Sequence, residues 1–97
     1  MNERFDEIRA EITANDRALI DGVNVRLRLV AELWQIKQDR GLGRTDPGRE
    51  RELLETLATT NDGPLSDDGL AEFVTGLLAL TRREIEKGDG ASQAPPR

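Results

Sequence analysis

The fold of this chain is decided by residues 19–37, which read LIDGVNVRLRLVAELWQIK. Apolar residues recur there in alternating steps of three and four, so they lie on one face of an α-helix. Two cations, Arg26 and Lys37, occupy positions on this apolar face. They are three helical turns apart and therefore point the same way, at about 16 Å separation along the axis. Because a buried cation without a partner is unfavourable, either acidic side chains or an anionic ligand must neutralise this pair.

The helical pattern extends well beyond this stretch. No proline interrupts it, so we predict one helix from about Glu3 to Asp39, ended by Gly41 and Gly43. At 1.5 Å per residue this helix is roughly 55 Å long. A chain of 97 residues cannot cover such a helix with short helices alone. We therefore predict a homodimer in which two copies of the first helix pack antiparallel or crossed.

Two shorter helices are predicted after the long one. Asp46-Pro47 is typical of an N-cap followed by the first helical residue, so a second helix begins there. The sequence NDGP at residues 61–64 is a turn signal that ends it. Ser66 is the expected N-cap of a third helix, which ends near Lys87-Gly88. No period-two strand pattern is present, so the predicted fold class is all-α.

The length of the chain fits one domain, which we place at residues 1–88, followed by a disordered tail at residues 89–97. Only 36% of the residues are apolar and three are aromatic, so the core of a monomer is thin. No apolar run reaches membrane-spanning length and the N-terminus has no apolar signal region. The sequence therefore favours a cytoplasmic protein without a membrane partner.

The composition also restricts the chemistry. Cysteine is absent, which excludes a thiol nucleophile and a zinc–thiolate site. Histidine is absent too, so the commonest general base and the commonest metal ligand are missing. The net charge of −5 argues against a protein that binds a nucleic acid backbone. If the protein is an enzyme, its reaction must need little ordinary proton transfer, or a perturbed carboxyl group must transfer the proton.

Charged residues also lie on the apolar sides of the two shorter helices. Glu50 is one turn from Leu53, and Glu84 continues the seven-residue spacing of Leu70 and Leu77. Each such residue, taken separately, is best explained by a structural ion pair or by an exposed helix edge. That explanation accounts poorly for interior-facing charges on all three helices at once.

Arg9 lies on a different face of the long helix from Arg26. The two are seventeen residues apart, about 100° around the helix and about 25 Å along its axis. Arg9 therefore cannot easily join the Arg26 cluster of its own chain, but it can join that of a partner chain that crosses the other way.

Five charged positions have a specific spacing: Arg9, Arg26, Lys37, Arg49 and Glu50. Around them stand the segments IRAEI at 8–12, VRLRLVAE at 25–32, DPGRERELL at 46–54 and GPLSD at 63–67, together with Asp16. In this combination the chain resembles the all-helical (type II) chorismate mutases over roughly residues 3–86. The tail lies outside the resemblance.

The resemblance implies a homodimer of three-helix chains with two active sites, each completed by the long helix of the other subunit. It implies the Claisen rearrangement of chorismate to prephenate, in the branch of aromatic amino acid biosynthesis that leads to phenylalanine and tyrosine. This concerted reaction needs no nucleophile, metal or cofactor. The enzyme must hold a dianion in a compact shape and stabilise the charge that grows as the ether C–O bond breaks.

The resemblance also assigns roles to the cations. Arg26 of one chain and Arg9 of the other clamp the two carboxylates, because the guanidinium fork matches a carboxylate. Lys37 donates to the ether oxygen. Glu84 occupies the position where bacterial members usually carry Gln, the second donor to that oxygen, and a Glu there can donate only when protonated.

The remaining roles and departures follow from the same resemblance. Glu50 is expected to accept from the ring hydroxyl with the backbone at Asp46 assisting, and Arg49 to lie beside a carboxylate. Leu80 stands where the family commonly has Ser, so one polar contact to the substrate is expected to be absent. Trp34 stands where the family usually has a small residue. A structural role explains it best, either packing within the chain or a place in the dimer interface.

Two alternatives remain open at this point. One is isochorismate-pyruvate lyase, a pericyclic enzyme of the same fold that acts on a close isomer. The other is a catalytically inert helical dimer that serves as a binding or regulatory module. The inert module predicts that Arg26 and Lys37 are paired by carboxylates of the protein itself.

Overall fold

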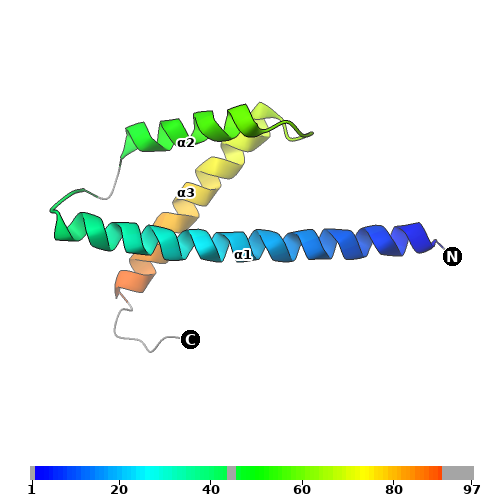
Figure 1. Ribbon diagram of the computed structural model, residues 1–97, viewed down its shortest axis with the longest axis horizontal. Helices are drawn as coiled ribbons and strands as arrows, with labels where there is room; N and C mark the ends of the chain where they lie inside the picture. Colours follow the sequence, from blue (N-terminus) through cyan, green and yellow to red (C-terminus); the bar gives the residue numbers. More distant parts are fainter. Residues whose placement is uncertain (1, 44–45, 91–97) are drawn as a thin grey trace.

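Three helices make up the computed structural model, which describes residues 2–43 and 46–90 (Figure 1). They are α1 (Glu3–Asp39), α2 (Pro47–Thr60) and α3 (Asp67–Gly90). The described residues contain no strand, and the predicted all-α class is confirmed. Helix α3 continues two residues past its predicted end at Gly88. The rest of the predicted tail, residues 91–97, lies outside the described residues.

Local signals begin and end α1. The Oδ1 atom of Asn2 accepts a hydrogen bond from the backbone N–H of Phe5 at 3.1 Å, which satisfies one of the free amides of the first turn. At the other end Gly41 has a φ of 70°, a conformation that glycine adopts without a Cβ clash. The amide of Leu42 then donates to the carbonyl of Lys37 at 2.8 Å. The predicted end of the helix at Gly41 is confirmed.

The predicted caps of the shorter helices are confirmed as well. The Oδ1 atom of Asp46 accepts from the amide of Arg49 at 3.1 Å and so begins α2. The Oγ atom of Ser66 accepts from the amide of Gly69 at 3.0 Å at the start of α3. In both places a side-chain acceptor replaces the carbonyl that a first-turn amide lacks.

Helix α3 is the element that joins the fold, because it packs against both α1 and α2. It crosses the C-terminal half of α1, while α2 lies to one side of α1 (Figure 1). The N-terminal half of α1 extends away from the other two helices (Figure 1). The chain measures 59 × 36 × 16 Å along its principal axes. Its smallest dimension has room for no more than the two helices that cross, α1 and α3, so the helices form a thin layer (Figure 1).

A thin layer leaves little room for a core. The buried apolar side chains of the described residues are those of Trp34, Leu70, Val74 and Ile85. Trp34 is buried within its own chain, as the packing interpretation expects. Many large apolar side chains are exposed along α1, including Phe5, Ile8, Ile12, Leu19, Ile20, Val25, Leu29, Leu33 and Ile36. An apolar surface of this extent is typical of an interface.

Within residues 2–43 and 46–90, no helix combines the length and apolarity that crossing a membrane requires.

Candidate active site

A cleft of about 310 Å³ is lined by side chains from all three helices. The face of α1 that carries the charged stripe forms one wall, the first turns of α2 form the other, and α3 contributes an apolar side chain. The lining residues are Arg26, Val30, Leu33, Lys37, Asp46, Arg49, Glu50, Leu53 and Leu78. Five of the residues predicted from the sequence are therefore brought together, namely Arg26, Lys37, Asp46, Arg49 and Glu50.

The cleft combines three cations with two carboxylates. Arg26, Lys37 and Arg49 outnumber Asp46 and Glu50 by one charge. Asp46 also caps α2, so its carboxylate is already engaged by a backbone amide. Fixed cations in a partly enclosed cleft favour an anionic ligand.

Arg26 is half-buried, and its hydrogen-bond partner is a neutral group. Its Nη1 atom donates to the Oγ1 atom of Thr81 on α3 at 2.6 Å. Thr81 is only 5% exposed and donates its own hydroxyl hydrogen to the carbonyl of Leu77 at 2.7 Å. The positive charge of Arg26 is thus held in place without being neutralised.

Lys37 is also half-buried. Within residues 2–43 and 46–90, neither Lys37 nor Arg26 forms an ion pair with a carboxylate. The inert-module alternative predicted carboxylate partners for both cations, and the described part of the chain provides none. The pair is therefore available to an anionic ligand.

The acidic and basic residues of α2 that line the cleft differ in their surroundings. Glu50 forms an ion pair with Arg82 of α3, with 2.9 Å between Oε2 and Nη1. Arg49 forms an exposed pair with Glu52 on its own helix at 3.5 Å. The exposed pair contributes little to stability, so the Arg49 side chain can move to a ligand at small cost.

Two predicted site residues lie outside this cleft. Arg9 is exposed on the N-terminal half of α1, where its guanidinium lies 5.5 Å from the ring centroid of Phe5. Glu84 is half-buried and pairs with Lys87 at 3.0 Å between Oε2 and Nζ. Neither residue lines the cleft of a single chain, and their substrate roles stay predictions. Leu80, noted as a departure from the family, lines a separate cavity between α1 and α3.

Thr81 is the residue that sequence reasoning missed. It lies seven residues after Val74 and four before Ile85, and both of these are buried, so it shares the inner face of α3. The sequence signal that could have identified Thr81 is a hydroxyl on the apolar stripe of one helix, opposite an interior-facing arginine of another.

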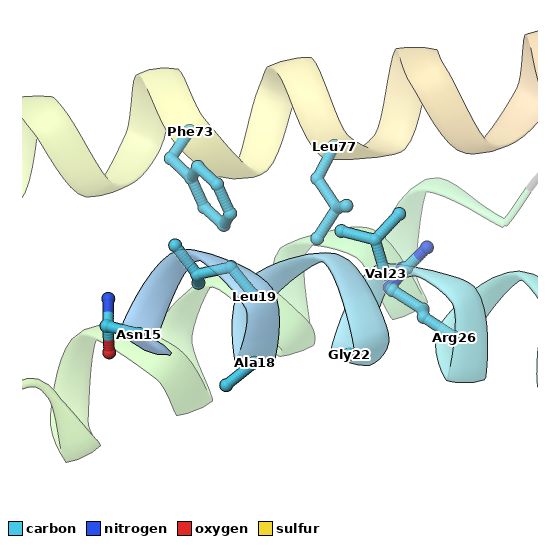
Figure 2. Close-up of a pocket in the computed structure, with 8 residues that line it drawn as sticks. All are labelled: Asn15, Ala18, Leu19, Gly22, Val23, Arg26, Phe73 and Leu77. Carbon is cyan, nitrogen blue, oxygen red and sulfur yellow. The ribbon is translucent and has the colours of Figure 1, made fainter. Parts of the chain in front are cut away.

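Another cavity, of about 300 Å³, lies where α1 and α3 cross (Figure 2). Phe73 and Leu77 of α3 point towards Leu19 and Val23 of α1, and Arg26 lies at one end (Figure 2). Most of its lining is apolar, so this cavity suits apolar side chains better than a dianion.

Comparison with known proteins agrees with the geometry of the cleft. The family model for type II chorismate mutases matches residues 8–86. The chain belongs to this family. Chorismate mutase activity, an isomerisation, is accordingly its function.

Two solved structures from Thermus thermophilus are similar to this type II chain. Form I of chorismate mutase is 29% identical, covers 81% of this chain and 99% of its own, and has a TM-score of 0.78. Form II is 28% identical, covers 87% of this chain and 96% of its own, and has a TM-score of 0.82. No curated protein matches the sequence. The similarity spans nearly the whole of the two Thermus chains.

Proposed function

We propose that this chain converts chorismate to prephenate in the cleft between α1 and α2. The observation that carries the proposal is the pair of half-buried cations, Arg26 and Lys37, on one face of α1 without a carboxylate partner among the described residues. Chorismate is a dianion, and its two carboxylates supply the negative charge that this face lacks.

Each charged residue of the cleft has a separate role in the reaction. Arg26 and Arg49 hold carboxylate groups, since a guanidinium binds a carboxylate through two parallel hydrogen bonds. Glu50 accepts a hydrogen bond from the ring hydroxyl, and the backbone at Asp46 assists. These contacts hold the substrate in the compact conformation from which it reacts.

Lys37 acts on the transition state itself. The ether C–O bond breaks while the new C–C bond forms, and no atom is gained or lost. Negative charge grows on the ether oxygen during this step. A fixed ammonium donor aimed at that oxygen stabilises the transition state more than the ground state, and therefore raises the rate. In this proposal Glu84, in its protonated form, is the second donor.

The proposal includes a homodimer with shared sites. Its support is the uncovered N-terminal half of α1, where Phe5, Ile8 and Ile12 are exposed. The long helix of a second copy can cover this face and the apolar cavity of Figure 2. Arg9 of the partner subunit then reaches the cleft from the open side. Sedimentation at micromolar concentration should give a dimer, and a stable folded monomer would contradict this part of the proposal.

The direct test is an assay of purified protein with two substrates. Chorismate should lose its absorbance and give prephenate as the product, identified by chromatography and mass. Isochorismate should give no pyruvate. Release of pyruvate from isochorismate, with no conversion of chorismate, would assign the chain to the lyase alternative.

We also propose that the protein is cytoplasmic, as expected from the sequence.

A further inference from the structure

The long helix α1 carries a seam with a strict seven-residue repeat. Each repeat contributes two positions, three residues apart. The first series is Phe5, Ile12, Leu19, Arg26 and Leu33, and the second is Ile8, Asn15, Gly22, Leu29 and Ile36. The large apolar members of both series are between 41% and 60% exposed, so the seam is open. This is the pattern of a coiled coil, in which each seam residue packs against the seam of another long helix.

The helix that fits this seam is a second copy of α1 that runs antiparallel. In a parallel, in-register pair each seam residue meets its own copy. Arg26 would then face the partner's Arg26, and Gly22 would face the partner's Gly22. Such a pair opposes two like charges and leaves one layer empty. In an antiparallel pair each residue of the first series meets one of the second, which avoids both defects.

One antiparallel register pairs the whole seam. It sets Leu19 against Gly22 of the partner subunit, next to the two-fold axis, and it sets Arg26 against the partner's Asn15. The other layers are apolar on both sides: Ile12 with the partner's Leu29, Phe5 with the partner's Ile36, and Leu33 with the partner's Ile8. The two polar side chains of the seam therefore meet each other.

A shift of the register by one repeat separates this polar pair. In one direction Arg26 would face the partner's Ile8, and in the other direction Asn15 would face the partner's Leu33. A buried polar side chain opposite an apolar one loses its hydrogen bonds with water and gains none in return. Either shift also leaves seam residues at the helix ends unpaired. Asn15 and Arg26 together therefore favour a single register.

The cavity of Figure 2 lies where this register places the two-fold axis. Asn15 lines one end of the cavity and Arg26 lines the other (Figure 2). Gly22 lies between them, and a Cβ added to it would meet no atom within 4 Å. The partner's Leu19 fits this space. The seam alone gave the register, so the position of the cavity supports it independently.

The same register brings Arg9 to the cleft. Arg9, Val30 and Lys37 are separated by whole repeats, so they lie on one flank of the seam. A two-fold axis that relates antiparallel helices keeps each flank on its own side. The partner's Arg9 therefore comes beside Val30 and Lys37, which line the cleft.

We propose that Asn15 fixes the register in which two copies of α1 pair, by meeting Arg26 of the partner subunit. The amide oxygen of Asn15 accepts a hydrogen bond from the guanidinium, which has five N–H groups and uses one of them for Thr81. Because the amide is neutral, the charge of Arg26 stays available to an anion. The inference rests on the homodimer of the proposed function and adds the residue that aligns it.

Introduced cysteines can report the register, because the chain has none of its own. Ile12→Cys/Leu29→Cys places cysteines at facing positions, and oxidation should give a covalent dimer. Phe5→Cys/Leu29→Cys and Ile12→Cys/Ile36→Cys match the two shifted registers and should remain uncross-linked. Within one chain the two cysteines are at least about 25 Å apart, too far to bond. Cross-linking mainly by a shifted pair, or by no pair in a protein that sediments as a dimer, would overturn the inference. A wild-type monomer would contradict the homodimer itself.

Asn15→Leu tests the polar layer. It leaves the partner's Arg26 opposite a leucine, so the dissociation constant of the dimer should rise about 10- to 100-fold and the shifted cysteine pairs should begin to cross-link. Asn24→Leu makes the same change at an exposed position off the seam and should alter neither. Adding Arg26→Leu to Asn15→Leu makes the layer apolar and should restore tight assembly. Unchanged assembly and register in Asn15→Leu, or further weakening in the double variant, would overturn the inference and leave the homodimer standing.

Discussion

Arg82 holds Glu50 at the edge of the cleft, with 2.9 Å between Nη1 of the arginine and Oε2 of the glutamate. The pair joins α3 to α2, and its side chains are 45% and 34% exposed. Because solvent screens such a pair, it adds little to the free energy of unfolding, about 0–1 kcal/mol. Its importance is local, since it offsets a negative charge beside the cleft in which we propose that a dianion binds.

Arg82→Gln should raise KM for chorismate about two- to fivefold and leave kcat nearly unchanged, because an uncompensated Glu50 repels the substrate. Steady-state kinetics at low and high salt measure the effect, which salt should reduce. Arg83→Gln is the matched control, since it removes the same charge from the adjacent exposed position of α3. An equal increase in KM in both variants would attribute the effect to net charge and not to the ion pair.

The two central cations can be tested by truncation. Arg26→Ala and Lys37→Ala should each reduce kcat/KM by ~10²–10⁴, equivalent to about 3–5 kcal/mol of transition-state stabilisation. Arg28→Ala removes an exposed arginine from the same helix and should leave the rate much closer to that of the wild type. Near-normal rates in both truncation variants, with intact folding, would assign Arg26 and Lys37 to structure.

Sharing of the site between subunits can be tested by mixing variants. Arg9→Ala and Arg26→Ala homodimers should each be nearly inactive. After subunit exchange, a heterodimer carries both lesions in one site and leaves the other site intact. Activity should then rise towards half the wild-type value per heterodimer. If labelled chains prove that exchange has occurred and no activity returns, each site is formed within one chain.

The substitution Glu84→Gln should preserve or improve activity. Its carboxylate pairs with Lys87, and an ionised carboxylate cannot donate to the ether oxygen. Glu84→Gln provides a permanent donor, so kcat/KM for chorismate should be preserved or increased. A clear loss of activity in Glu84→Gln, with intact folding and assembly, would remove Glu84 from the ether-oxygen role.

The helical period explains why Thr81, and not Glu84, lies on the buried face of α3. A spacing of seven places Glu84 in register with Leu70, but a straight α-helix drifts about 20° per heptad. After two heptads Glu84 has rotated about 40° from the line of Leu70, whereas Thr81, eleven residues on, is within about 20° of it. The face buried against α1 therefore includes Thr81 and leaves Glu84 at its edge.

The sequence by itself determined the three helices, their caps and the charged stripe on α1. Asp46, Ser66 and Gly41 act on backbone groups within a few residues, and Arg26 and Lys37 share a face because the helical period is local. Only the tertiary structure decided which side chain meets each cation or acid. The contacts of Arg26 with Thr81 and of Glu50 with Arg82 depend on where α3 crosses the other helices, and that crossing is set by the packing of side chains distant in sequence.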